Sequence, residues 1–283
     1  MPSTRKTGGL RTAGIQKTDR PGQPLVTVVT VVYNGEKYVR HTIESVLGQT
    51  YPNLEYIVVD GGSTDATLSI LGEYESRIDY WVSERDRGIS DAFNKGIGLA
   101  GGSIVGLINA DDWYEPATVE RVVQHLQNAD VAYGNLQSWE RGAPQYVFHA
   151  DHTRLAWEMT VNHPTVFVRK ALYEQFGVFD LSYKIAMDYD LMMRFYTGGA
   201  RFVYVNQVLA NMRLEGVSEK QWITGFREVR QIKEKYLGKK SGHALYFYKQ
   251  VAATYLSRRL GTSPLAGLLR FYRRHLSMIR KSK

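Results

Sequence analysis

The feature that most constrains the fold is an alternation of short β-branched runs with segments of helical period between residues 25 and 128. The run 26–32, Val-Thr-Val-Val-Thr-Val-Val, predicts a strand buried on both faces in a parallel sheet. Further strands are predicted at 54–59, 78–82 and 103–108, with helices at 36–48, 65–76, 91–100 and 116–128. This order predicts βαβ units and an α/β fold with a mostly parallel central sheet flanked by helices.

The 283 residues, of which 43% are hydrophobic, are enough for a sizeable core. Residues 1–24 are rich in Gly, Thr and basic side chains and lack apolar periodicity, so we predict a disordered basic tail. The regular pattern occupies 25–135. Residues 136–215 are rich in Trp, Tyr and His at irregular spacing, which indicates a second half of the same domain, and 216–283 are predicted to form a basic helical extension.

The net charge of +8 is unevenly distributed along the chain. Residues 1–24 hold five Lys/Arg and one Asp, and residues 235–283 hold twelve Lys/Arg and no acid, so the body carries a net charge of −8. A nucleic-acid-binding protein more often carries a basic patch on its folded body. We therefore expect no nucleic-acid partner, and an acidic body fits a site that uses a metal ion.

The chain has no cysteine, which excludes disulfides, cysteine-ligated metals and thiol nucleophiles. We find no secretory signal behind the first residues and no run of about 20 apolar residues that would span a membrane. We expect a cytoplasmic protein that could also contact the inner face of the plasma membrane peripherally.

Two adjacent carboxylates, Asp111 and Asp112, follow the strand predicted at 103–108. They repel each other unless a cation lies beside them, and a few hard oxygen ligands suit Mg²⁺ or Mn²⁺ shared with substrate phosphates. The alternative is that the pair caps the helix predicted at 116–128. Because ligands bind beyond the carboxyl ends of parallel strands, the position favours the metal.

A further acid, Asp60, ends the strand at 54–59 and precedes Gly61 and Gly62. It could accept hydrogen bonds from a ribose or a base, while the glycines permit a ligand to approach the backbone; the alternative is a capped turn. The chain has no GxGxxG after its first strand and no GxxxxGK[ST], which disfavours dinucleotide oxidoreductases and P-loop enzymes. Asp60 and the acids at 111–112 are expected to face one crevice.

Polar side chains elsewhere could reach the same crevice. In the segment 86–96, Arg87 and Lys95 could contact a phosphate or the base, or they could be solvated charges on a capped helix. His163 could bind a phosphate or a metal, and it could equally be a structural histidine.

The segment 187–194 places two acids beside an apolar run. On a helix, Asp188 and Asp190 point to different faces, so one could act as a base while the other caps the helix or pairs with Arg194. The alternative is that the acids only cap the helix.

The order and spacing of these segments resemble glycosyltransferase family 2, a group of inverting enzymes with the GT-A fold. The resemblance runs from about Val26 to Arg194. It is carried by four blocks in register, which are Val-Val-Thr-Val-Val-Tyr-Asn-Gly at 28–35, Val-Val-Asp-Gly-Gly-Ser-Thr-Asp at 58–65, Asp-Arg-Gly-Ile-Ser-Asp-Ala-Phe-Asn-Lys-Gly at 86–96 and Asn-Ala-Asp-Asp at 109–112.

The resemblance implies a set of donor-binding residues. Thr30 and Tyr33 would hold and stack the base of the donor, and Asp60 would bond the base or the ribose. Asn94 and Lys95 would line the same donor site.

The resemblance also implies the metal ligands and the catalytic base. Asp111 would bind the donor and the metal, with Asp112 as its neighbour at the metal, and Asp188 would be the general base. The sequence departs from the family pattern at two positions, since Asn109 replaces the first Asp of the metal motif and Met187 replaces the acid before Asp188.

The implied activity is a metal-dependent, inverting transfer of a sugar from a nucleotide diphosphate sugar to a hydroxyl of a saccharide or lipid-linked acceptor, with Mg²⁺ or Mn²⁺ as cofactor. Residues 25–135 would bind the nucleotide sugar and 136–215 the acceptor, and bacterial surface polysaccharide or glycolipid assembly is the pathway the family most often serves. The alternatives are a nucleotide-sugar-binding protein without catalysis and a nucleotidyltransferase. The latter lacks its expected Gly-rich basic loop after the first strand.

Apolar residues recur at helical spacing between 265 and 279, with five basic residues among them at 270–281. This pattern predicts an amphipathic basic helix suited to an anionic membrane surface. The alternative is a helix that packs on the domain with its basic face in solvent.

Overall fold

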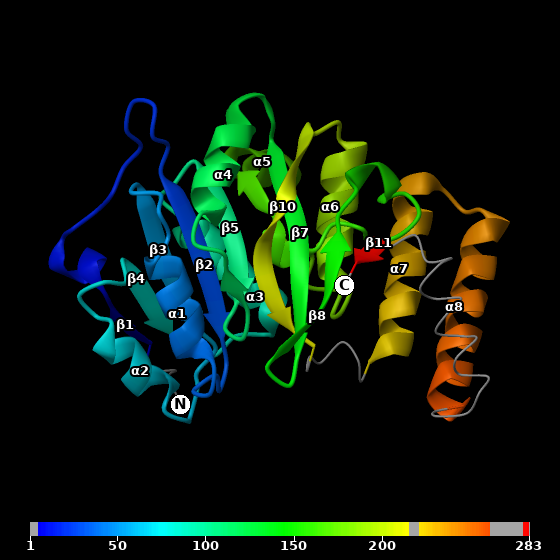
Figure 1. The fold of residues 1–283 in the computed structure, drawn as a ribbon, viewed down its shortest axis with the longest axis horizontal. Coiled ribbons are helices and arrows are strands. Elements are labelled where there is room, and N and C mark those ends of the chain that lie inside the picture. Colours follow the sequence, from blue (N-terminus) through cyan, green and yellow to red (C-terminus); the bar gives the residue numbers. More distant parts are fainter. Residues whose placement is uncertain (1–4, 215–220, 261–279, 283) are drawn as a thin grey trace.

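The strands of the protein form one mixed sheet, as seen in a computed structural model that describes residues 5–214, 221–260 and 280–282 (Figure 1). Their order is β1-β4-β3-β2-β5-β9-β7-β10-β6, with β8 paired to β7 and β11 to β8. The strands are β1 Lys6–Gly8, β2 Val26–Val32, β3 Leu54–Asp60, β4 Tyr80–Ser83, β5 Ile104–Asn109, β6 Trp113–Tyr114, β7 Val131–Glu140, β8 Ala143–His149, β9 Phe167–Arg169, β10 Phe202–Arg213 and β11 Arg280–Ser282.

Four neighbouring strands, in the order β4-β3-β2-β5, are parallel and form the centre of the sheet. All residues of β2 and β3 are buried, as the uninterrupted β-branched pattern predicts for strands covered on both faces. The chain runs outward from β2 through β3 to β4 and then returns to the other side of β2 as β5. This reversal creates a switch point at the carboxyl ends of β2 and β5, where open α/β sheets bind ligands.

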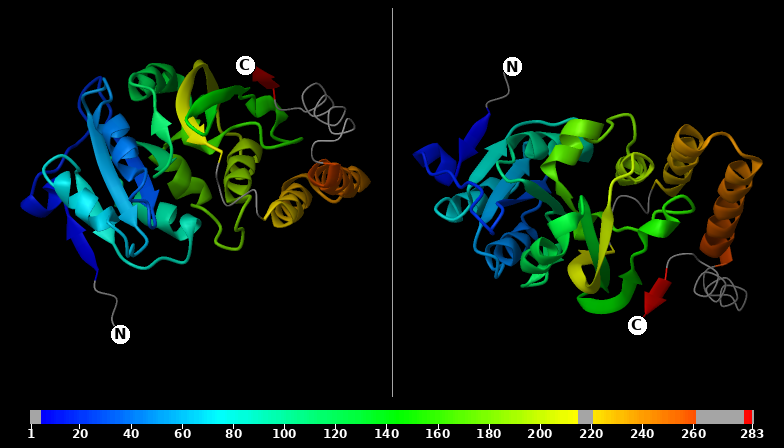
Figure 2. Two further views of the ribbon diagram at one scale, coloured as in Figure 1. Left: turned by 60° about the horizontal axis from the view of Figure 1, so that its bottom comes forward. Right: turned by 90° about the horizontal axis from the view of Figure 1, so that it is seen from above.

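Helices cover both faces of this sheet, which gives the three layers seen in Figure 2. The helices α1 Val39–Leu47, α2 Thr67–Glu73 and α4 Thr118–His125 bury their apolar sides in one core. The helices α3 Ile89–Leu99, α5 Lys170–Phe176 and α6 Met187–Thr197 close the other core. The predicted α/β class is confirmed, and each predicted helix of the first half forms, although most begin later or end earlier than the sequence indicates.

The second half adds antiparallel strands and the helices at one end of the molecule. β9 runs antiparallel to both β5 and β7, whereas β7 and β10 pair in parallel over a long register with two irregularities. The remaining helices are α7 Trp222–Leu237 and α8 Ser241–Leu260, with short 3₁₀ turns η1 Leu10–Ala13, η2 Leu126–Asn128, η3 His152–Arg154 and η4 His163–Thr165.

The prediction of a disordered tail over 1–24 is wrong for residues 5–24, which the structure describes. β1 pairs with the edge strand β4, with Lys6 opposite Ser83. The guanidinium of Arg11 pairs with Glu55 and donates to the carbonyl of Leu99 at 2.8 Å. Arg11 therefore neutralises a buried acid of the sheet instead of remaining in solvent.

The predicted basic helix at 265–279 lies outside the described residues. Residues 280–282, for which the sequence predicts a continuation of that helix, form strand β11 instead and pair with β8 at His149. In the parts of the chain that the structure describes, no helix has the length and apolar character needed to cross a membrane.

Replacing Arg11 tests the anchoring of the N-terminal segment. Glu55 is buried and also accepts from Thr27 Oγ1 at 2.6 Å and from the N–H of Gly101 at 2.8 Å. Arg11→Met leaves this buried carboxylate without its cation, so we expect the free energy of unfolding to fall by about 3 kcal/mol in urea denaturation. Arg5→Met, which removes a half-exposed pair with Glu84, should cost less than about 1 kcal/mol. Equal losses in the two variants would contradict the anchoring role.

Candidate functional site

The loops that follow β2 and β3 are linked by hydrogen bonds into one rim of the switch point. Asn34, in a left-handed conformation with φ of 49°, donates its N–H to Ser63 Oγ at 2.7 Å and accepts the N–H of Thr64 at 2.9 Å. The N–H of Gly35 donates to Thr67 Oγ1 at 2.9 Å. The two motifs at 28–35 and 58–65 therefore form one structural unit.

Asp60 stabilises the turn after β3 from inside the protein. Its carboxylate is fully buried and accepts hydrogen bonds from the N–H groups of Gly62 and Ser63 at 3.1 and 3.0 Å. It also accepts the hydroxyl protons of Ser63 and Ser83, the latter at 2.6 Å. Gly62 has a φ of 86°, so it takes a conformation that other residues rarely adopt. Asp60 thus shapes the turn, and its direct contact with a donor stays a prediction.

Tyr33 and Asp86 lie on either side of Gly61 at the same rim. Tyr33 is 66% exposed although it is a large aromatic residue. A Cβ placed on Gly61 would collide with the carboxylate of Asp86 and would lie 3.5 Å from the Tyr33 ring. The N–H of Gly61 already donates to the carbonyl of Val32 at 2.8 Å, so the exposed ring and the neighbouring carboxylate are the groups that can stack against and hydrogen-bond a planar base. The sequence motif at 86–96 contains Asp86 but gave no reason to single it out.

Three of the predicted donor residues are engaged inside the protein. Thr30 is fully buried and accepts the hydroxyl proton of Tyr56 at 3.0 Å, on the face of the sheet covered by α1 and α2, and its contact with the base stays a prediction. Asn94 exchanges two hydrogen bonds of 2.9 Å with the backbone of Phe179. Lys95 pairs with Glu84 at 3.0 Å, and contact of Asn94 or Lys95 with a donor stays a prediction.

The turn at 109–112 begins where β5 ends, beside the first loop. Asp111 is half-buried there, and Oδ1 of Asn109 is buried without a hydrogen-bond partner among the described residues. Asp112 is buried and accepts from Asn109 Nδ2 and from the N–H of Arg213, both at 3.3 Å. Burial and the neighbouring Asp111 raise the pKa of Asp112 well above its usual value. Asp112 therefore faces inward, and this placement argues against its predicted role as a metal ligand.

The oxygen atoms at and next to Asp111 are suited to bind a hard divalent cation. Within 5–214, 221–260 and 280–282, no three His, Cys, Asp or Glu side chains cluster as a closed metal site would require. Mg²⁺ and Mn²⁺ bind instead through one or two carboxylates together with substrate phosphates. The unpartnered oxygen of Asn109 and the carboxylate of Asp111 are oxygen ligands of this kind.

Arg213, at the end of β10, brings positive charge to this turn. Its guanidinium donates to the carbonyl of Asp111 and lies 4.2 Å from the ring centre of Tyr38 and 4.5 Å from that of Trp113. Rings on both sides fix the guanidinium with little loss of side-chain freedom on ligand binding. No sequence motif singles out Arg213, because β10 is distant in sequence from the turn at 109–112 and meets it only in the folded sheet.

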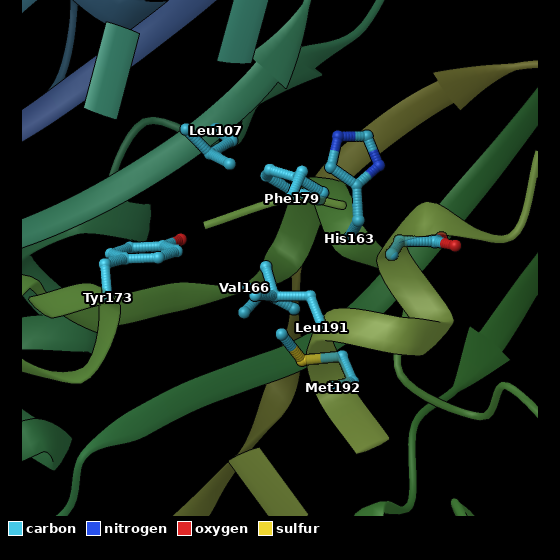
Figure 3. Close-up of a pocket in the computed structure, with 8 residues that line it drawn as sticks. Leu107, His163, Val166, Tyr173, Phe179, Leu191 and Met192 are labelled. Atoms are coloured by element: carbon cyan, nitrogen blue, oxygen red, sulfur yellow. The ribbon is translucent and has the colours of Figure 1, made fainter. Parts of the chain in front are cut away.

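Asp188 lies in the first turn of α6, next to the α3 segment of the third motif. Ser90 Oγ donates to the sulfur of Met187 at 2.8 Å, which joins the first turns of α3 and α6. Asp188 lines a small enclosed cavity with Leu107 of β5 and with His163. Figure 3 shows Leu107, His163 and other side chains of this cavity converging from separate segments.

Burial raises the pKa of Asp188 to about 6. A carboxylate with a pKa near the working pH can accept a proton in a reaction and release it afterwards. Burial also lowers the pKa of His163 to about 4, and the Nε2 of this histidine has no hydrogen-bond partner among the described residues. His163 is therefore a neutral neighbour of the site at physiological pH.

Asp188 also lines a second, more open groove of about 270 Å³. Apart from Asp188, its lining is apolar or aromatic. The lining residues are Met159, Ile185, Ala186, Tyr189, Trp222, Gly225, Phe226 and Val229.

The family model named Glycosyl transferase family 2 matches residues 27–196, more than half of the chain. The chain belongs to glycosyl transferase family 2. The match contains the rim loops, the turn at 109–112 and Asp188, whereas Arg213 and α7 lie beyond it.

Similar proteins include glycosyltransferases. An uncharacterized glycosyltransferase of Rickettsia typhi is 32% identical over 187 residues, which are 61% of this chain and 58% of that protein. Chondroitin synthase of Escherichia coli is 31% identical over 209 residues, which are 68% of this chain and 29% of that protein. The chain thus spans little more than half of the first relative and under a third of the second.

Two solved structures share the fold at low sequence identity. The mannosyltransferase PcManGT from Pyrobaculum calidifontis, in complex with GDP-Man and Mn²⁺, has a TM-score of 0.62 at 19% identity over 92% of this chain and 84% of that one. S. aureus TarS in complex with UDP-GlcNAc has a TM-score of 0.59 at 21% identity over 86% of this chain and 74% of that one. The predicted GT-A fold is confirmed.

In this member of the family, an Asp188→Asn variant tests the cost of burying the carboxylate. The folded protein holds the proton of Asp188 with a pKa of about 6 instead of the usual 3.8. The protonated group therefore favours folding below about pH 4, and this contribution is lost as the pH rises through 6. We expect the variant to be more stable than the wild type at pH 8 by about 1–2 kcal/mol, with the difference vanishing towards pH 4. Thermal unfolding across this pH range measures it, and a constant difference would contradict the raised pKa.

Proposed function

We propose that this protein is a metal-dependent, inverting glycosyltransferase that moves a sugar from a nucleotide diphosphate sugar to an acceptor hydroxyl. The observation that supports the proposal most strongly is the placement of Asp188, a carboxylate with a raised pKa that lines an open apolar groove as well as the small cavity next to β5. Membership in family 2 and the glycosyltransferase names of the relatives point the same way.

The donor would bind at the switch point. Tyr33 would stack on the base, Asp86 would accept a hydrogen bond from its polar edge, and Asp60 would hold the turn in shape. Arg213 would place its charge next to the diphosphate. The structural relatives solved with UDP, UDP-GlcNAc and GDP-Man support a nucleotide-sugar donor without deciding which one this chain uses.

Asp111, with Asn109 beside it, would hold the divalent cation, which when bound acts as a Lewis acid that stabilises charge on the leaving diphosphate. The Mn²⁺ in the complex of the mannosyltransferase PcManGT supports this assignment. Asp112 would keep the turn in place from the interior through its bond with the N–H of Arg213.

The proton transfer is assigned to Asp188. As the acceptor oxygen forms its bond to the anomeric carbon, Asp188 takes the hydroxyl proton, and the bond between that carbon and the diphosphate oxygen breaks with its electron pair going to the diphosphate. Attack from the side opposite the leaving group inverts the anomeric centre. The cavity residues Leu107 and Phe179 keep bulk water from the inner side of the carboxylate.

The groove at Asp188 would receive the acceptor. Trp222 and Phe226 supply aromatic faces that suit the apolar face of a sugar ring, and Met159 and Val229 supply aliphatic surface. We propose a saccharide or lipid-linked acceptor for this reason, with surface polysaccharide or glycolipid assembly as its setting. The chondroitin synthase relative supports polysaccharide chemistry.

Removing the base tests the catalytic assignment. With a donor found by thermal-shift screening of UDP-, GDP- and dTDP-sugars, Asp188→Asn should lower kcat by about 10²–10⁴-fold because no group accepts the proton. The wild-type kcat/KM should fall below about pH 6, where Asp188 becomes protonated. Glu174→Gln, at an exposed residue of α5, serves as the matched control and should transfer at the wild-type rate. Full activity of Asp188→Asn would refute the role.

Removing the metal ligand tests the donor site. Asp111→Ala should weaken donor binding at least about tenfold in the presence of Mn²⁺, because the metal links the protein to the diphosphate. Binding measured by calorimetry in EDTA should differ little between variant and wild type. Glu120→Ala, an exposed change on α4, is the control, and an unchanged Mn²⁺-dependent affinity in Asp111→Ala would exclude a metal at this residue.

A further inference from the structure

The N-terminus of α6 is capped from another helix. Glu228 of α7 is buried, and its two carboxylate oxygens accept the N–H groups of Lys184, Ile185 and Ala186 at 3.0, 2.9 and 2.8 Å. Ala186 occupies the N-cap position, where it has no side chain able to accept these protons. Glu228 therefore binds the backbone that leads into α6, including the N–H of Ala186, which the helix start leaves without a partner in the helix.

The residue before the proposed base, Met187, is not acidic. Met187 accepts a hydrogen bond from Ser90 through its sulfur, so this side chain is directed to α3. Asp188 Oδ1 accepts the N–H of Tyr189 at 2.8 Å, which holds the carboxylate at the helix start. The second carboxylate at this helix end is thus supplied by Glu228, about 40 residues later in the chain.

The helix that carries Glu228 is fixed to α6 at both of its ends. Near Glu228, α7 approaches so closely that a Cβ on Gly225 would lie 3.1 Å from Ile185 Cγ2. Near its other end, Lys235 and Tyr236 both donate to the buried Asp190 of α6 at 2.9 Å. The two helices therefore behave as one rigid pair, with Glu228 next to the base.

The titratable groups that line the small cavity with Asp188 or act on its charge come from three elements besides its own. His163 of η4 is neutral near pH 7 because burial lowers its pKa to about 4, and burial also raises the pKa of Tyr173 of α5, which keeps that phenol neutral. From α7, the negative charge of Glu228 raises the pKa of Asp188 further. The charge felt by the base from these neighbours thus comes from Glu228.

We propose that Glu228 is a positioning residue for the proposed reaction: by binding the N–H groups of 184–186 from α7, it fixes the first turn of α6 and with it the direction of Asp188 towards the acceptor groove. The inference rests on the proposed role of Asp188 as the base. It also explains how position 187 can be a methionine, since the acid that supports the base comes from a different helix.

The same helix forms a wall of the acceptor groove. Trp222, Gly225, Phe226 and Val229 line the groove within one and two turns of Glu228. Because Glu228 joins this wall to the start of α6, the acceptor surface and the base keep a fixed relation. A shift of about 1 Å in such a relation is enough to lower a rate by about 10²-fold.

The test uses the full chain with Glu228→Gln, which keeps the shape but removes the charge, and Glu228→Asp, which keeps the charge but shortens the reach. Glu234→Gln, on the same helix and paired with Arg230 at the surface, is the matched control. The titration midpoint of Asp188 is followed by NMR on protein with ¹³C-labelled aspartate carboxyls, with the signal assigned by its loss in Asp188→Asn. Transfer is measured in parallel at a temperature where every variant is folded.

In Glu228→Gln we expect the Asp188 midpoint to fall by about 0.5–1 pH unit, because a like charge is removed, and kcat to fall by about 10–100-fold with little change in donor KM. In Glu228→Asp we expect the rate to fall with a smaller change of the midpoint. Glu234→Gln should match the wild type in both. If Glu228→Gln loses thermal stability alone and keeps the wild-type midpoint and kcat, or if Glu228→Gln does not fold and Glu228→Asp keeps the wild-type kcat, the proposal is overturned.

The NMR arm separates this inference from the proposed function. A shifted midpoint in a protein that transfers no sugar in any assay would refute the activity while leaving the Glu228–Asp188 coupling in place. An unshifted midpoint with active wild-type protein would refute the coupling alone.

Discussion

The site depends on the parallel pairing of β2 with β3 on one side and with β5 on the other. Parallel strands end at the same edge of a sheet, so this arrangement brings the loops after residues 32, 60 and 109 together although they are far apart in sequence. Alternate side chains of these strands pack into two different cores, and this fixes the register, because a slip by one residue would move each side chain to the other core, where it does not fit its neighbours. What the residues at the edge can do chemically follows from that register.

Buried carboxylates fix the backbone around the site by accepting hydrogen bonds from its N–H groups. Asp60 gathers the turn at 61–63, Asp112 holds the end of β10, and Glu228 holds the start of α6, each by accepting backbone N–H groups. A buried carboxylate is tolerable only when hydrogen bonds or charges compensate its lost hydration, so each of these acids constrains the backbone around it. The acidic body of the chain therefore has a structural use besides any contact with a cation.

The sequence alone predicted the α/β class with a mostly parallel sheet and the helices of the first half, because those depend on the local period of apolar residues. It placed Asp111 and Asp188 correctly at ends of elements. It did not show that the alternation of side chains along β2 directs the hydroxyl of Thr30 to Tyr56, inside the core covered by α1 and α2. Arg11, Arg213 and Glu228 act through contacts across the sheet or between helices. Their partners are distant in sequence, and a local sequence pattern does not predict such partners.

The most direct test of the proposed enzyme is whether a cation at Asp111 and the base at Asp188 belong to one site. With carboxyl-labelled aspartate, donor nucleotide and Mn²⁺, paramagnetic relaxation should broaden the NMR signals of both residues. The signal of Asp130, which pairs with Arg201 at the opposite edge of the sheet, should stay sharp. Broadening of Asp111 without Asp188 would show that the two acids serve separate surfaces and would contradict a shared site.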